Sequence, residues 1–576
     1  MHLRNVIQRH PNTFYISASA ASALFGLTMT PTLVPLVLTL TMLLLYAPVL
    51  FHRHPFIQTP LLWISISLSS SLGRLVPALN ALSTAGPSVA VLLGMSAVAS
   101  GVAILAIFAD VYISSRTGTA QAVLFPAIWT SLWAVISHLP FNLGRLTSWT
   151  PMSGTQAYQW MAPWTGPAGI DWVTAGWAVV VSQPIQNWYM GNTDDEIPTD
   201  GTSRRPSRAA GTWVLALVLT VLTIPSFILF PGPLPVVSSE TVSTLTVGCI
   251  LPTGPSPGIE DYIAESVTLG NRGSGTKLLL WPEGAVHFRD ASERDAAFDT
   301  IRNKIKDNSW LYLGVSFEET TIDDVSGGTS VSHTGLAILS TKDVHEVYHK
   351  RYLVPVAESF RLTPGSSPPP IITVPLRKVN GMSSERAIDV TASICLDFAM
   401  PAPFRDLDYK PGLILAPART WDPAIGNRMW EEVKQRANEV GSVALWCDGG
   451  KGGVSGVAGG GYNGIYQVGE GSWVRTVGIP YPFDSNRTFY SRVGDASVVA
   501  ASWFLVLGLV TYKKTRRNAL VVNTRDWIVH NIRRSQQAVA GVAMSIREWV
   551  VQMTTRRKPA VAGVANEPNL IEFGSD

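Results

Sequence analysis

The chain separates into a strongly apolar part and a part in which short apolar runs alternate with polar residues. Residues 14–51 carry no charged side chain over 38 positions, which exceeds the length of about 20 residues that one membrane span needs. We therefore expect two helices there with a turn near Pro31; a cleaved signal peptide, with small residues at 18–24, is the alternative. Further apolar stretches lie at 56–77, 88–113, 120–139, 170–184, 213–229 and 496–512. The pattern predicts an α-helical membrane bundle of about eight spans.

The pattern changes at residue 242. From there, buried-strand patterns alternate with amphipathic helical patterns and with turns rich in Gly, Pro and Asn. We expect strands at 243–251, 277–281, 310–318, 387–396, 413–417 and 442–447, a hairpin of 334–341 with 344–349, and helices at 258–269, 291–308 and 425–439. This order predicts an α/β layered domain. The expected division is a membrane domain at 1–241, a catalytic domain at 242–490, a last span at 491–512 and a basic tail at 513–576.

One apolar run ends in a carboxylate that could act as a general base. Leu278 to Trp281 form the run, Pro282 ends it because proline cannot donate to a sheet, and Glu283 follows. A carboxylate beside apolar surface has its pKa raised, as a base working near neutral pH requires. A capping or salt-bridged glutamate is the alternative.

Two more polar residues follow apolar runs downstream. Lys350 lies in the segment Tyr348 to Glu358, which reads YHKRYLVPVAE, and Cys395 follows Ser393-Ile394. With Trp281-Pro282-Glu283, these motifs resemble those of the apolipoprotein N-acyltransferase family, a membrane branch of the nitrilase or carbon-nitrogen hydrolase superfamily. The resemblance covers roughly residues 14 to 512.

The resemblance implies an αββα sandwich with a Glu-Lys-Cys triad. Glu283 would be the general base, Lys350 the oxyanion stabiliser and Cys395 the nucleophile, with Glu358 and Asp397 as supporting carboxylates. The chain departs from the family in having Val356-Ala357 where the bacterial pattern has Phe-Gly, and Leu396-Asp397 where it has Tyr-Glu. These departures leave the three triad residues in place, but the acceptor specificity of the family cannot be carried over to this chain.

These residues predict a membrane N-acyltransferase. A free thiol is only weakly ionised at pH 7, so Cys395 needs a base and a cation before it can attack a carbonyl. The enzyme would take an acyl chain from a phospholipid, hold it as a cysteine thioester and pass it to an amine or lipoprotein-like acceptor, without a cofactor. A membrane-anchored amidase or nitrilase and a catalytically silent scaffold are the rival functions.

Three other motifs compete with this interpretation. His345 to His349 spells H-E-x-x-H, but the flanking sequence predicts a strand, and a zinc site of this kind needs a helix. The glycine-rich stretch 449–464 lacks the Lys-Ser/Thr pair of a P-loop and predicts a hairpin. The chain has three cysteines, too few for a disulfide framework, so Cys249 and Cys447 are interpreted as structural and Cys395 as reactive. No metal site is expected.

Composition and charge agree with a membrane protein. Hydrophobic residues make up 46% of the chain, charged residues 15%, and the net charge of +3 gives no basis for binding nucleic acid. Basic residues fall on the side of the N-terminus when the expected spans are counted, at 52–54, 116, 204–208 and 513–517. The catalytic domain then faces away from the cytoplasm, on the side where the sequon at Asn486 would be glycosylated.

Two further segments contact the membrane in this interpretation. The loop 149–172 is rich in tryptophan, and it is either an interfacial aromatic belt or a wall for lipid access. Residues 513–558 hold eleven Lys or Arg against Asp526 and Glu548, typical of a basic segment on the cytoplasmic membrane surface or of a solvated tail.

Overall fold

The computed structural model describes residues 7, 9–52, 55–82, 84–117, 120–139, 145, 148–190, 208–229, 232–254, 256–271, 275–323, 329–355, 357–376 and 385–555. Arg53, His54, Arg204, Arg205, Val356 and residues 556–576, which entered the predictions above, lie outside these ranges. The chain forms two compact units, Met1–Gly508 and Leu509–Asp576. The described part of the second unit is helical up to Thr555.

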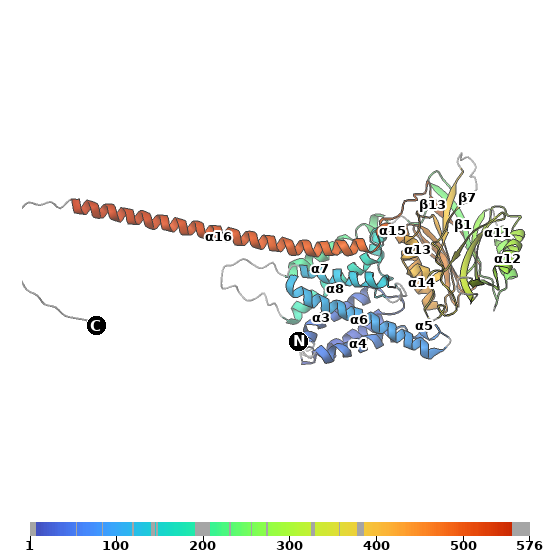
Figure 1. The fold of residues 1–576 in the computed structure, drawn as a ribbon, viewed down its shortest axis with the longest axis horizontal. Helices are drawn as coiled ribbons and strands as arrows, with labels where there is room; N and C mark the ends of the chain where they lie inside the picture. Colours follow the sequence, from blue (N-terminus) through green and yellow to red (C-terminus); the bar gives the residue numbers. More distant parts are fainter. Residues whose placement is uncertain are drawn as a thin grey trace, which may run out of the picture. The chain divides into compact units, whose positions relative to one another are not determined.

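A helix lies in every stretch that the sequence marks as apolar (Figure 1). The turn near Pro31 separates the first two helices, as predicted. The helices are α2 (Pro11–Gly26), α3 (Leu33–His52), α4 (Pro55–Leu72), α5 (Leu75–Leu79), α6 (Ala85–Thr117), α7 (Gln121–Ser137), η3 (Gln156–Met161), α8 (Ala162–Met190), α9 (Arg208–Val221), α10 (Ser226–Leu229) and α16 (Ala496–Thr555).

Length and composition support fewer membrane spans than the eight expected. Among the described residues, 3 helices are long and apolar enough to cross a bilayer, at Leu33–Phe51, Ala85–Ser114 and Gly211–Ile228. Gln121–Ser137 and Ala496–Tyr512 are apolar but shorter. The expectation of eight spans is therefore not established, because an apolar helix can also be buried inside a protein.

Residues 242–480 build two sheets that pack face to face. The first has the order β13-β1-β2-β4-β5-β6, with β3 paired to β4, and the second has the order β12-β11-β10-β9-β8-β7. In each sheet three central strands are parallel, β1-β2-β4 and β8-β9-β10. The first sheet comprises β1 (Val242–Cys249), β2 (Thr276–Leu280), β3 (Val286–Phe288), β4 (Tyr312–Asp323), β5 (Thr329–Leu339), β6 (Val344–His349) and β13 (Trp473–Pro480). The second comprises β7 (Ile371–Pro375), β8 (Ala387–Ala392), β9 (Leu413–Ala418), β10 (Val443–Asp448), β11 (Val454–Gly459) and β12 (Tyr462–Val468).

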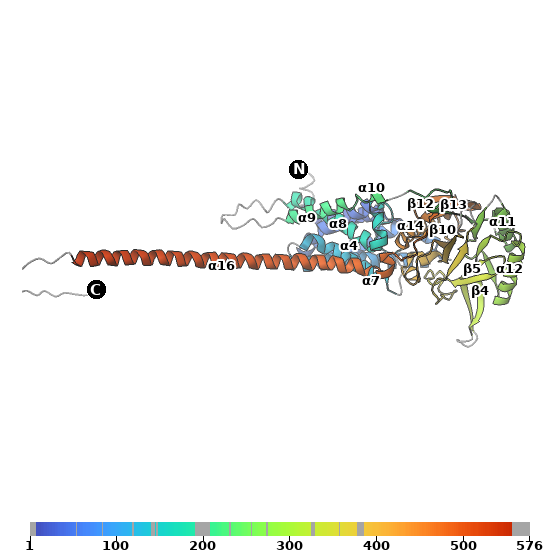
Figure 2. The same ribbon diagram turned by 90° about the horizontal axis from the view of Figure 1, so that it is seen from above.

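Helices cover the outer face of each sheet. α11 (Ile259–Asn271) and α12 (Ala291–Lys304) lie on the first sheet, and α14 (Pro423–Val440) lies on the second (Figures 1 and 2). One apolar core joins the two sheets and α14, and another lies beneath α11 and α12. The predicted αββα layering is present.

The helical layer beside the second sheet also contacts the bundle. α14 and the short α15 (Phe489–Val493) both pack against α8. At this contact α8 is kinked at Gly166, whose φ is 56°. A Cβ atom there would come within 2.2 Å of the Tyr490 ring, so only glycine fits.

Most predicted elements of the catalytic domain are confirmed, and the differences lie at edges and turns. The strand expected at 387–396 ends at Ala392, and Cys395 instead begins the 3-10 helix η5 (Cys395–Ala399). The edge strands β3, β7, β12 and β13 and the hairpin partner β11 were not predicted individually. The glycine-rich stretch does form the predicted hairpin, of β11 and β12.

Candidate active site

Glu283 stands at the end of β2, where the sequence predicts it. Trp281 is buried against Tyr262, with ring centroids 5.0 Å apart, and its indole N–H donates to Ser266. The backbone N–H of Glu283 donates to the carbonyl of Ala418 at 3.3 Å, which ties the loop after β2 to the second sheet. The carboxylate is buried and accepts a 2.7 Å hydrogen bond from Lys350 Nζ.

Lys350 directly follows β6 and is completely buried. Its ammonium donates to Glu283 Oε1 at 2.7 Å and to both carboxylate oxygens of Glu358, at 2.9 and 2.8 Å. Glu358 also accepts from the backbone N–H of Val354. A buried ammonium needs such partners, because an unpaired charge in the interior is very costly.

Cys395 sits in a strained turn just after β8. Its φ is 43°, and among the described residues it is the only non-glycine with positive φ. Such a conformation costs on the order of 1–3 kcal/mol and persists only where the surroundings impose it. The prediction that Cys395 ends a strand was wrong: the strand stops three residues earlier, and the turn carries the thiol away from the sheet ladder.

Asp397 holds this turn in place. Its side chain accepts hydrogen bonds from the backbone N–H of Ile394 at 3.0 Å, the backbone N–H of Tyr352 at 2.9 Å and the hydroxyl of Tyr348 at 2.8 Å. Asp397 thus joins the cysteine turn to the segment that follows Lys350. Tyr348 was missed as a contributor, although it lies on β6, two residues before Lys350.

Burial and the neighbouring charges set the protonation states of Glu283 and Cys395. Burial raises the pKa of Glu283 to about 7, against the lowering effects of Lys350 and of a hydrogen bond from Cys395. Burial, together with Glu283, holds the pKa of the Cys395 thiol well above 9 although Lys350 opposes it. Burial alone would lower the pKa of Lys350, but Glu283, Cys395 and Glu358 raise it well above its usual value. The resting site is therefore a neutral thiol beside a carboxylate that can accept its proton.

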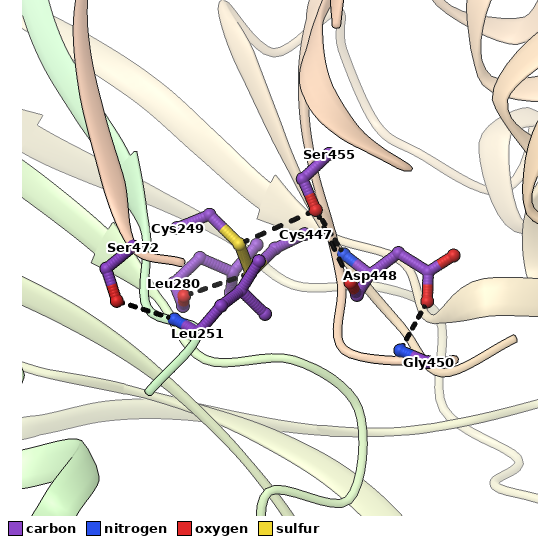
Figure 3. The surroundings of a disulfide bond; sticks show 8 residues. All are labelled: Cys249, Leu251, Leu280, Cys447, Asp448, Gly450, Ser455 and Ser472. Atoms are coloured by element: carbon purple, nitrogen blue, oxygen red, sulfur yellow. Dashed lines mark hydrogen bonds between the residues drawn. A yellow bond between two sulfur atoms is a disulfide. The ribbon is translucent and has the colours of Figure 1, made fainter. Parts of the chain in front are cut away.

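The remaining cysteines form a disulfide, which the sequence interpretation did not foresee. Cys249 of β1 and Cys447 of β10 are bonded across the two sheets, 198 residues apart in the chain. Figure 3 shows the bond beside Leu280, whose carbonyl oxygen lies 3.2 Å from the Cys447 sulfur. Cys447 is structural, as predicted, and the sheets are joined next to the strand that carries Glu283. Their pairing could not be found by spacing because only the tertiary fold brings β1 and β10 together.

The H-E-x-x-H motif lies on strand β6, as its flanking sequence predicts. The two imidazoles bind different partners: His345 Nε2 lies 3.0 Å from Ser340 Oγ, and His349 Nε2 lies 2.9 Å from Glu319 Oε1. The histidines thus belong to separate local networks.

The tryptophan-rich loop has both buried and exposed rings. Trp149 is buried, whereas Trp164 is 60% exposed and lies 6.4 Å from the Phe489 ring. The aromatic belt and the wall for lipid access both stay predictions.

No family model matches the sequence, and no curated protein matches it. Among solved structures, an amidase from Nesterenkonia sp. is 18% identical, with a TM-score of 0.30, covering 41% of this chain and 90% of that one. A cysteine variant of the Nesterenkonia AN1 amidase, described as from the nitrilase superfamily, is 17% identical with a TM-score of 0.31. It covers 45% of this chain and 97% of that one. A third form, with the acetamide moiety of fluoroacetamide covalently added at its active-site cysteine, is 18% identical with a TM-score of 0.32, covering 45% and 97%.

Proposed function

We propose that the protein is a membrane N-acyltransferase that works through a thioester on Cys395. The observation that carries the proposal is the convergence of Glu283, Lys350 and Cys395, from the segments that follow β2, β6 and β8, into one buried cluster. The motifs that resemble apolipoprotein N-acyltransferase contain these same three residues. The packing of α14 and α15 on α8 supports a lipid donor, since it sets the catalytic domain against an apolar bundle.

The first half-reaction forms the thioester. Glu283 takes the thiol proton as the sulfur of Cys395 attacks the ester carbonyl of a phospholipid, and Lys350 stabilises the oxyanion. The carbon–oxygen bond then breaks, and protonated Glu283 returns the proton to the leaving alkoxide, which departs as a lysophospholipid.

In the second half-reaction an amine attacks the thioester. Glu283 accepts a proton from the amine, the carbon–sulfur bond breaks, and protonated Glu283 returns the proton to the leaving thiolate, which restores the thiol of Cys395. The acyl chain stays in apolar surroundings throughout, which avoids a cost of about 0.8 kcal/mol for each methylene exposed to water. The donor therefore reacts before the acceptor binds, giving ping-pong kinetics.

The test is to incubate the full-length protein with acyl-labelled phospholipid and no acceptor. We expect a stoichiometric label that hydroxylamine removes, on the wild type and not on Cys395→Ala. Release of lysophospholipid only when an amine is present would contradict the ping-pong order. Steady release of free fatty acid at the rate of thioester formation would favour the amidase-like alternative, in which water resolves the acyl-enzyme.

We also propose that the catalytic domain lies outside the cytoplasm. Three features support this topology: the distribution of basic residues along the sequence, the exposed side chain of Asn486 in the sequon, and the Cys249–Cys447 disulfide. Disulfides persist mainly in oxidising compartments. A cysteine introduced at exposed Ser366 of a plasma-membrane form should react with an impermeant reagent on intact cells. Reaction only after permeabilisation would reverse the topology.

A further inference from the structure

The side of α14 that meets the bundle carries a row of buried charges. Arg428, Glu432, Arg436 and Glu439 are all 2% exposed or less, and their spacing of four, four and three residues puts them on one helix face. Such residues are almost never fully buried unless they are paired. The hydrogen-bond partners of these four residues therefore indicate the role of this helix face.

Glu439 joins α14 to the membrane domain. Its Oε1 atom accepts a 2.7 Å bond from Arg145 Nη1, and its Oε2 atom accepts a 2.6 Å bond from Arg436 Nη1. Arg145 lies in the chain between α7 and α8, and its Nη2 atom also donates to the Tyr490 hydroxyl at 3.2 Å. Two guanidinium groups, one from each domain, thus share a single carboxylate.

Arg436 continues this connection to the cysteine turn. Its Nε atom donates to the backbone carbonyl of Phe398 at 3.3 Å, and its guanidinium lies 5.2 Å from the Phe404 ring centroid. Phe398 is fully buried and lies in η5, three residues after Cys395. Asp397 fixes the turn from the side of Lys350, and Arg436 fixes it from the side of the membrane domain.

Arg428 on the same face has different partners. It donates to Glu432 at 2.8 Å and to the backbone carbonyl of Arg145 at 2.7 Å. None of the hydrogen bonds described for Arg428 reaches η5. Arg428 therefore connects α14 to the membrane domain by hydrogen bonds that do not include the cysteine turn, whereas Arg436 also contacts that turn.

We infer that Arg436 is a positioning residue for Cys395, which couples the nucleophile turn to the membrane domain through Glu439 and Arg145. The inference rests on the proposed role of Cys395 as nucleophile. The strained backbone at Cys395 needs support on both sides, and one of the two supports comes from Arg436, which is linked to the bundle through Glu439. The thiol then meets Glu283 correctly only when the catalytic domain is docked on the bundle.

The test compares Arg436→Lys with the matched control Arg428→Lys in the purified full-length protein. A lysine keeps the positive charge, but its ammonium lacks the planar arrangement of N–H donors with which the guanidinium binds Glu439 and the Phe398 carbonyl at the same time. The first readout is the pH dependence of Cys395 alkylation by iodoacetamide, which requires no acyl donor. The groups that influence the thiol, Glu283, Lys350, Glu358 and Asp448, are the same in both variants. The second readout is kcat and KM for acyl transfer from labelled phospholipid.

For Arg436→Lys we expect the midpoint of the alkylation profile to fall from its raised wild-type position, which burial and Glu283 impose on the thiol, toward the ordinary thiol value of about 8.5. We expect kcat to fall by tenfold to a hundredfold, as for a displacement of about 1 Å, with KM within twofold. Arg428→Lys should keep both the profile and kcat. If Arg436→Lys does not fold, Arg145→Lys should move the profile in the same direction.

A wild-type alkylation profile in a folded Arg436→Lys or Arg145→Lys protein would overturn the inference. An equal shift in Arg428→Lys would also overturn it, because the effect would then follow from domain contact in general. Failure of acyl transfer in the wild type, with the expected alkylation profiles, would instead count against the proposed function and leave the positioning role standing.

Discussion

Two buried ionic clusters in this protein have opposite compositions. At the candidate active site, the carboxylates of Glu283 and Glu358 share the one ammonium of Lys350. At the interface of α14 with the bundle, the guanidinium groups of Arg145 and Arg436 share the one carboxylate of Glu439. Burial, helped by the second carboxylate, raises the pKa of Glu283 to about 7, so it can exchange a proton near neutral pH. Arginines in excess keep their charge at any relevant pH, so the second cluster can hold structure but cannot take part in acid–base chemistry.

The largest effect is expected from removing members of the first cluster. We expect acyl transfer to fall by about a thousandfold or more in each of the single variants Cys395→Ala, Glu283→Ala and Lys350→Ala. When catalytic residues act as a unit, removing any one of them abolishes most of the rate enhancement. The double variant Cys249→Ala/Cys447→Ala is the control and should still form the thioester at temperatures where it is folded. A chelator should leave the wild-type rate unchanged. A thioester label on Cys395→Ala would show that another residue is the nucleophile.

The next effect should come from the second cluster and appear in stability. Glu439→Gln keeps the shape of the side chain but leaves Arg145 and Arg436 without a counter-charge in a buried place. Breaking a buried pair in this way costs about 3–5 kcal/mol, which should lower the Tm of the protein in detergent. An unchanged Tm would show that water reaches this interface and replaces the carboxylate.

The pH dependence sharpens the comparison because only the first cluster titrates near neutrality. Glu283 must be deprotonated to accept the thiol proton, and burial raises its pKa to about 7. The rate of thioester formation should therefore rise with pH and level off above about 7, with roughly a tenfold loss for each unit below that value. Single-turnover measurements with labelled phospholipid would check this. A rate that falls as the pH rises through 7 would exclude Glu283 as the base.

The smallest effect is expected on a more exposed part of α14. Glu431 and Lys434 form a 2.7 Å pair, and their side chains are 22% and 17% exposed. Glu431→Gln should change stability by less than about 1 kcal/mol, since pairs near solvent contribute little. This variant is the matched control for Glu439→Gln, and an equal loss of Tm in both would remove the distinction between buried and exposed pairs.

The sequence predicted the parts of the site that depend on local order. Leu278 to Trp281 followed by Pro282 indicated a strand end at Glu283, and the motif resemblance named the residues that meet it. The turn at Cys395 could not be predicted in this way, because its positive φ depends on the bonds of Asp397 to Tyr348 and Tyr352, which lie in another part of the chain. Contacts between residues that are distant in the sequence determine this backbone conformation.

Long-range pairing also explains what the sequence did not show. The charges of α14 look like a solvated helix face until Arg145 and Phe398 are brought against them. The disulfide of Cys249 with Cys447 requires β1 and β10 to face each other. The helices of the bundle were located correctly, but apolar character alone did not separate spans from buried helices.

Gly166 places the bundle and the catalytic domain at a fixed separation. Its missing side chain leaves room for the Tyr490 ring, and the same tyrosine bonds to Arg145. Any side chain at Gly166 would meet this ring and strain a backbone conformation that favours glycine. The contact therefore tolerates no added atom, and a substitution there would disturb both the packing of the two domains and the bond between Tyr490 and Arg145.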